Sequence, residues 1–76
     1  MKELLEAIAK AIVDSPDQVL VRAIEGEVIT VLELHVHPSD LGKVIGHEGR
    51  MAEAIRTILG AAGTKLQRSV AEEILD

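Results

Sequence analysis

Apolar side chains near the amino terminus recur at the spacing of an amphipathic helix. The residues that recur at this spacing are Leu4, Leu5, Ile8, Ala11 and Ile12. Ser15-Pro16 ends the pattern, because the residue before a proline is pushed out of helical geometry. The pattern therefore predicts a helix over residues 2–14.

A stretch rich in β-branched residues follows, QVLVRAIEGEVITVLELHVH at residues 18–37, and Gly26 divides it. A glycine between two alternating β-prone runs is typical of a hairpin, and we expect Gly26 to supply the positive φ of its turn. Alternate residues of a strand face opposite sides of a sheet. The second strand would turn Val28, Thr30, Leu32, Leu34 and Val36 toward the core, and Glu33, His35 and His37 toward solvent or a partner.

Two helices are predicted next. Pro38-Ser39-Asp40 begins a short one and Gly46 ends it, since proline suits a first helical turn and glycine suits a C-terminal cap. The second helix begins after Gly49, and we expect Gly60 and Gly63 to weaken and then stop it. Its apolar arc comprises Met51, Ile55, Ile58, Leu59 and Ala62, with Arg50, Glu53 and Thr57 opposite.

The final ten residues, QRSVAEEILD, fit two interpretations. Val70 and Ile74 would share one face of a strand, whereas Ser69-x-x-Glu72 fits a helical capping box. A strand is favoured, because a two-stranded hairpin is seldom stable alone and a third strand would complete the sheet. The sequence thus predicts a single α+β domain over residues 1–76, in the order α-β-β-α-α-β, with a three-stranded sheet packed on helices.

Length and composition exclude several classes of protein. A chain of 76 residues, 47% of them hydrophobic, allows one thin core and no deep active-site cavity. The absence of cysteine excludes disulfides and thiolate metal sites, and the absence of Phe, Tyr and Trp removes the platforms on which many single-strand binders stack bases. Because no apolar run approaches membrane-spanning length and no signal peptide is recognised, we expect a cytoplasmic protein that makes no membrane contact.

The charge is unevenly distributed along the chain. A net charge of −5 by itself argues against a polyanionic partner. The window from Lys43 to Arg68, however, holds five basic and two acidic residues, a net charge of +3, whereas the remainder holds three basic and eleven acidic residues, a net charge of −8. The positive part of the chain is centred on a pair of glycines.

That pair lies in VIGHEGR, residues 44–50, and has the form of a backbone cradle for a phosphate. A helix that starts after Gly49 offers free amide groups and the positive end of its dipole to an anion, and glycines let a phosphodiester approach closely. Lys43 and Arg50 flank the turn and are expected to reach the same phosphate. Val44, Ile45 and Ile55 are expected to line an apolar wall for bases. Taken alone, Gly-x-x-Gly is more often an ordinary turn between helices.

The longer run VIGHEGRMAEAIR is similar to the core signature of KH domains, Ile-Gly-x-x-Gly followed by a helix. The whole chain resembles the small bacterial single-KH-domain RNA-binding proteins of the KhpA/YlqC family, with a first helix beginning MKEL, a DSPD turn, a hairpin, the PSDLGKVIG and GRMAEAIR helices and a closing strand. The glycines of the family signature fall on Gly46 and Gly49. Its basic residues fall on Lys43, Arg50 and Arg56.

The resemblance implies a type II (prokaryotic) KH domain that binds single-stranded RNA without catalysis or a cofactor. It also implies a homodimer, or a heterodimer with a larger KH-containing protein, KhpB, and a role in post-transcriptional regulation or as an RNA chaperone. The implied RNA-binding residues are Lys43, Val44, Ile45, Gly46, His47, Glu48, Gly49, Arg50, Ile55 and Arg56.

Two positions, His47 and Glu72, depart from the family pattern. His47 stands where relatives commonly carry lysine or arginine, so we expect modest RNA affinity. Its neighbour Glu48 should repel a phosphate unless its side chain points away. Glu72 stands where relatives usually have a strand valine.

Three other interpretations compete with RNA binding. Glu33, His35 and His37 share a strand face and could hold a metal ion, although such a set is more often an exposed polar surface. His47-Glu48 resembles an acid–base pair, but no nucleophile or third orienting group accompanies it, which argues against an enzyme. The last interpretation is a degenerate KH fold that serves as a dimerisation module through Ile8 and Ile12, or through the end near Gly60 and Gly63.

Overall fold

The computed structural model describes residues 1–75, and Asp76, the last residue of the predicted domain, lies outside the described residues. The helices and strands follow one another in the order α-β-β-α-α-β, which confirms the predicted α+β class. The elements are α1 (Lys2–Ile12), β1 (Leu20–Glu25), β2 (Ile29–His35), α2 (Leu41–Ile45), α3 (Arg50–Lys65) and β3 (Ser69–Leu75).

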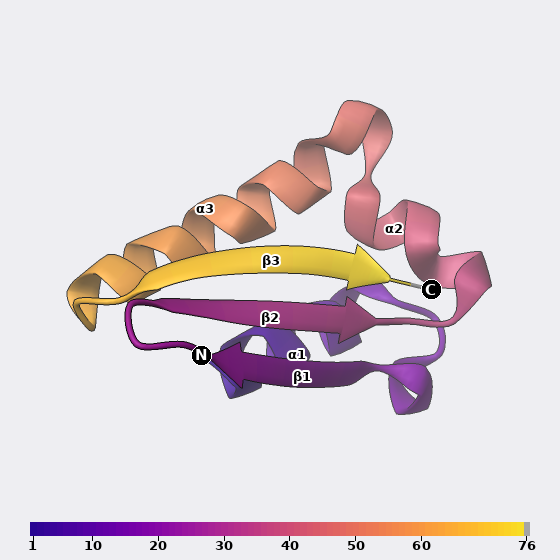
Figure 1. The fold of residues 1–76 in the computed structure, drawn as a ribbon. Helices are drawn as coiled ribbons and strands as arrows, with labels where there is room; N and C mark the ends of the chain where they lie inside the picture. Colours follow the sequence, from indigo (N-terminus) through magenta and orange to yellow (C-terminus); the bar gives the residue numbers. More distant parts are fainter. Residues whose placement is uncertain (76) are drawn as a thin grey trace.

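The three strands form one mixed sheet with β2 in the centre, antiparallel to β1 and parallel to β3. Parallel neighbours need a crossover connection, and α2 and α3 supply it between β2 and β3. In Figure 1, α1 lies behind the strands and α3 runs alongside β3. The turn between α2 and α3 is therefore the outermost point of the crossover.

The core lies between the sheet and the helices. On β2 the predicted inward face is confirmed for Thr30, Leu32 and Leu34, which are at most 4% exposed. Val36 is buried just beyond the strand, whereas Val28 is 74% exposed because it lies in the hairpin turn and not in the strand. Helical side chains close the core from the other side, among them Leu5, Ala9, Val44, Ile55 and Leu59.

The predicted positive φ at Gly26 is wrong. Among the described residues a positive φ occurs at Gly46, Glu48, Gly49 and Gln67. The Gly26 amide instead donates to the Ile29 carbonyl oxygen at 2.8 Å. The guanidinium of Arg68, the residue before β3, donates to the Gly26 carbonyl oxygen at 3.0 Å and to Thr30 Oγ1 at 2.9 Å. A long-range side chain thus holds the hairpin, and no left-handed glycine is needed.

The expectation that α3 stops at Gly63 is also wrong, because the helix continues to Lys65. Gly63 is buried against β3: a Cβ added there would lie 2.7 Å from Val70 Cγ2 and 2.8 Å from the Arg68 carbonyl oxygen. This glycine allows α3 to approach β3 closely. The helix ends where Gln67 adopts a positive φ and the Arg68 amide donates to the Gly63 carbonyl oxygen at 2.8 Å.

The predicted apolar arc of α3 is confirmed for Ile55 and Leu59, each 1% exposed. It is wrong for Met51 and Ile58, which are 36% and 48% exposed, because the core contacts a narrower arc than the apolar pattern suggests. Ala52 and Gly63 complete the buried arc and were missed, since small residues give a weak apolar signal.

The carboxyl-terminal segment forms a strand, as predicted, and not the alternative helix. Val70 and Ile74 pack against the core, and Glu72 lies between them on the same face of β3.

Replacing Gly60 and Gly63 separately by alanine should change stability in opposite directions. At Gly60 an added Cβ meets nothing within 4 Å, so higher helix propensity should raise the free energy of unfolding by about 0.5–1 kcal/mol. At Gly63 the clash with Val70 and Arg68 should lower it by about 1–3 kcal/mol. Urea denaturation measures both variants, and two stabilising substitutions would contradict the close packing of α3 on β3.

Candidate functional site

The turn between α2 and α3 depends on Gly46. Its backbone has φ 77° and ψ 177°, a conformation that is essentially restricted to glycine. A Cβ at this position would lie 2.6 Å from Met51 Cβ and 2.8 Å from the Met51 amide nitrogen. Gly46 is therefore required both by its dihedral angles and by the lack of space.

The next three residues bring the chain to the start of α3. Glu48 (φ 55°, ψ 28°) and Gly49 (φ 74°, ψ 11°) are both left-handed. A Cβ at Gly49 would meet nothing within 4 Å, so glycine is favoured there by its positive φ alone. Glu48 has a side chain in the same conformation, which costs roughly 1–2 kcal/mol. The surface in front of α3 is open.

The amino terminus of α3 faces this open surface. The helix has 16 residues, and its N-cap residue is Gly49, so no side chain caps the first turn. The positive end of the helix dipole is thus available to an anion, whereas the Arg50 amide donates to the His47 carbonyl oxygen.

Arg50, His47 and Glu48 form a small charged cluster at the turn. Arg50 Nη2 lies 3.8 Å from Glu48 Oε2, and His47 Nε2 lies 3.5 Å from Glu48 Oε1. The Glu48 side chain therefore points toward the site, where its carboxylate would repel a phosphate. Since all three side chains are at least 67% exposed, these contacts are weak and a stronger anion can replace the carboxylate.

The structure does not gather the other two predicted basic residues at the same point. Lys43 Nζ lies 3.1 Å from Asp14 Oδ2, so Lys43 is directed toward the end of α1. Both side chains are partly exposed, and a phosphate can compete for the ammonium group. Arg56 is exposed on α3, more than one turn beyond Arg50.

The predicted apolar wall needs a correction. Val44 is 0% exposed and Ile55 is 1% exposed, so both belong to the core beneath the turn and offer no surface to a base. They were misassigned because apolar residues beside a turn look the same in sequence whether they face inward or outward. Ile45, at 37% exposed, reaches solvent, and Met51, which was assigned to the core, is exposed next to it in the first turn of α3.

A buried carboxylate that the sequence analysis missed lies at the start of α2. Asp40 is 1% exposed, and its two oxygens accept hydrogen bonds from the backbone amides of Asp14 at 3.2 Å and Ser15 at 3.0 Å. It ties the end of α1 to the start of α2. The available signal was its place after Pro38-Ser39 at a helix start, where a carboxylate commonly serves as a backbone acceptor.

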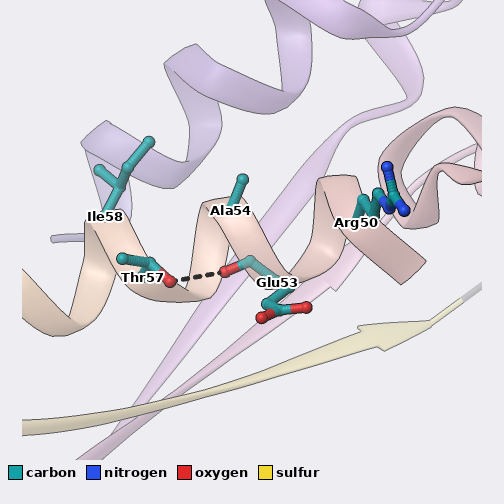
Figure 2. Close-up of a pocket in the computed structure, with 5 residues that line it drawn as sticks. All are labelled: Arg50, Glu53, Ala54, Thr57 and Ile58. Carbon is teal, nitrogen blue, oxygen red and sulfur yellow. Dashed lines mark hydrogen bonds between the residues drawn. The ribbon is translucent and has the colours of Figure 1, made fainter. Parts of the chain in front are cut away.

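A shallow hollow of about 600 Å³ runs along α3 on the side away from the core (Figure 2). Figure 2 shows Ala54 and Ile58 projecting to one side of the helix and Glu53 to the other. The hollow starts at Arg50, so it adjoins the turn. Its lining residues are Arg50, Glu53, Ala54, Thr57 and Ile58.

Other candidate chemistry finds little support in residues 1–75. In this part of the chain no group of three His, Cys, Asp or Glu side chains is placed to hold a metal ion. His37 Nδ1 instead lies 2.7 Å from Ser39 Oγ and 3.1 Å from the Ser39 amide nitrogen. None of the helices described is long and apolar enough to cross a membrane.

Comparison with known proteins gives consistent matches along the chain. The family profile described as "KhpA/KhpB, KH domain" matches residues 2–74. The chain is 53% identical over 75 residues to the RNA-binding protein KhpA of Clostridium acetobutylicum. The aligned region covers 99% of this chain and 100% of the relative.

The corresponding proteins of two other bacteria carry the same description, RNA-binding protein KhpA. The relative from Borreliella burgdorferi is 55% identical over 74 residues, 97% of this chain and 90% of the relative. The relative from Aquifex aeolicus is 51% identical over 76 residues, 100% of this chain and 96% of the relative. No solved structure gives a significant match.

Proposed function

The chain belongs to the KhpA/KhpB family of KH domains, and from that premise we propose that it is a non-catalytic RNA-binding protein. Its type II KH fold would hold the backbone of single-stranded RNA at the turn from Gly46 to Gly49. The observation that carries this proposal is the start of α3, which has no side-chain cap and directly follows the Gly46–Gly49 turn. Because neither glycine has a Cβ, a phosphate can approach the backbone there.

The electrostatics of the turn support a phosphate as the ligand. The helix amides and dipole attract an anion, and Arg50 adds a full positive charge at the first position of the helix. Lys43 can leave Asp14 for a second phosphate, because that ion pair is partly exposed. The proposed contact residues are Lys43, Ile45, Gly46, His47, Glu48, Gly49, Arg50 and Arg56, with Val44 and Ile55 supporting them from the core.

The bases would receive little specific recognition at this site. The chain has no aromatic residue to stack on them, and Ile45 and Met51 are the exposed apolar side chains beside the turn. Affinity would come mainly from the backbone and would be micromolar and salt-dependent. Weak, sequence-tolerant binding suits a post-transcriptional regulator or RNA chaperone acting on many RNAs of the cytoplasm, and that is the role we propose.

The Gly49→Asp variant tests whether the turn holds the RNA backbone. A Cβ fits at this position, and aspartate tolerates a positive φ better than most residues, so the variant should fold. Its carboxylate beside the phosphate should weaken binding of a single-stranded oligonucleotide by about tenfold. Fluorescence anisotropy at two salt concentrations measures the loss, which should shrink at the higher one.

Gly60→Asp is the matched control, because it makes the same substitution on the same helix, also in open space, and far from the turn. It changes the net charge equally and should leave affinity nearly unchanged. Equal affinities of a folded Gly49→Asp variant and the wild-type protein would remove the turn as the binding site.

Glu48→Lys should tighten RNA binding by about three- to tenfold. The substitution releases Arg50 and His47 from the carboxylate that contacts them and adds one positive charge beside the bound phosphate. Glu27→Lys makes the same change in the exposed hairpin turn, at the opposite end of the molecule from the α2–α3 turn (Figure 1). Anisotropy titrations of both variants should show tighter binding for Glu48→Lys alone, and equal gains would point to net charge as the cause.

A second proposal concerns the protein partner. The apolar strip expected at Ile8 and Ile12 is partly buried and packs against the core, and Gly63 is buried against Val70, so these positions offer little free surface for an interface. Gly60 faces open space but has no side chain to contribute. The hollow along α3 does offer such a surface, since Ile58 is 48% exposed beside Ala54. We propose that a second copy of this chain, or the KH domain of a larger KhpB-like protein, covers this face.

Ile58→Glu should convert a homodimer into a monomer, because a carboxylate would be buried in the interface without a partner. Val28→Glu is the control, since Val28 is more exposed and lies in the hairpin turn, outside the residues that line the hollow. Size exclusion with light scattering over a range of concentrations measures the mass of each protein. A wild-type protein that stays monomeric at high concentration would contradict self-association.

A further inference from the structure

Glu72 is a charged side chain on a face of β3 that otherwise packs against the core. It lies between Val70 and Ile74 on that face, and its neighbour across the sheet on β2 is the fully buried Leu32. Both carboxylate oxygens are buried and have no hydrogen-bond partner. A buried carboxylate without a partner is destabilising, so this residue needs an explanation other than packing.

The packing of α3 on β3 brings one basic residue toward this carboxylate. Gly63 touches Val70 and so marks the side of α3 that faces β3. Arg56 lies two helical turns earlier on the same side of α3. α3 and β3 run side by side in opposite directions (Figure 1). Going forward along β3 from Val70 to Glu72 therefore leads the same way as going back along α3 from Gly63 to Arg56.

The pKa of Glu72 depends on the same surroundings. Burial raises the pKa of Glu72 above its ordinary value, and the positive charge of Arg56 offsets part of that rise. On β2 the residues that share the inward face near Glu72 are Thr30, Leu32 and Leu34, none of them charged. Arg56 is thus a charged group through which Glu72 can act on the surface of the domain. Glu53, three residues before Arg56 on α3, projects to the side opposite Ala54 and Ile58 (Figure 2).

We propose that Glu72 is a buried counter-charge that lowers the affinity of the α2–α3 turn for RNA phosphates by offsetting the positive charge of Arg56. This inference rests on the proposed RNA-binding function. Protonation of Glu72 removes the counter-charge, so affinity should rise as the solution becomes more acidic. Because the carboxylate is buried, salt should screen its effect less than it screens the exposed Glu48.

Glu72→Gln tests the proposal, because it keeps the shape of the side chain and removes its charge. We expect RNA to bind about threefold more tightly at pH 7, with a gain that persists at high salt and disappears under acidic conditions where wild-type Glu72 is itself protonated. Glu73→Gln is the matched control: it lies next in the chain, is exposed on the other face of β3 and changes the net charge equally. It should change affinity much less.

Two further measurements separate the counter-charge from a merely structural role. In an Arg56→Gln background, Glu72→Gln should no longer tighten binding, because the charge on which it acts is gone. Thermal unfolding without RNA should show the wild-type protein losing stability relative to Glu72→Gln as pH rises through the raised pKa of Glu72. Stability falls in this direction because the fold favours the protonated carboxyl of Glu72, and that form is lost as pH rises through the raised pKa.

The outcomes distinguish this proposal from the function on which it rests. If the wild-type protein binds RNA and Gly49→Asp weakens binding, but Glu72→Gln and Glu73→Gln bind equally, the counter-charge is wrong and the RNA site stands. A gain from Glu72→Gln that survives in the Arg56→Gln background also overturns it. A wild-type protein that binds no RNA overturns both.

Discussion

The close contact between α3 and β3 at Gly63 determines where the functional groups of this domain lie. With no side chain at this position, the helix rests directly on Val70 and on the backbone at the start of β3. The direction of α3 is thereby set, and its amino terminus lies away from the sheet, at the α2–α3 turn in the middle of the crossover (Figure 1). Ala54 and Ile58 are left on the free side of the helix (Figure 2). One small residue in the second half of α3 thus positions groups in its first half.

The site at the start of α3 is a balance of charges within an acidic protein. The positive end of the helix and Arg50 favour an anion, and each nearby basic side chain has a carboxylate close to it. Glu48 contacts Arg50 and His47, Asp14 contacts Lys43, and Glu72 acts on Arg56 from the core. The first two carboxylates are exposed and can be displaced by a phosphate, whereas both oxygens of the third are buried and out of reach of a phosphate at the surface. Affinity for RNA would follow from how many of these carboxylates a phosphate displaces.

The two surfaces proposed for function lie on one helix and differ in chemistry. The amino terminus of α3 offers dipole and charge to a phosphate, and the hollow between Arg50 and Ile58 offers apolar surface to a protein. Arg50 belongs to both, so a partner on the hollow would approach the phosphate site closely. A small domain with a thin core gains stability from such a partner, and the partner would leave the turn itself open.

The sequence by itself determined the order of the elements, the strand at the carboxyl terminus and the position of the glycine turn. The order of the elements and the glycine turn depend on local chemistry: alternation in strands, proline and glycine at helix ends, and dihedral angles at Gly46 that other residues do not adopt. The last strand was favoured because it completes the sheet. Only the tertiary structure decided which apolar residues are covered, because an apolar pattern does not reveal what packs against it. In the structure Val44 and Ile55 lie in the core, whereas Met51 and Ile58 are exposed. It also turned Gly63 from an expected helix terminator into the point where α3 meets β3, and it brought Asp40 to α1 and Glu72 toward Arg56. Those roles depend on contacts between segments distant in sequence, which local preferences do not encode.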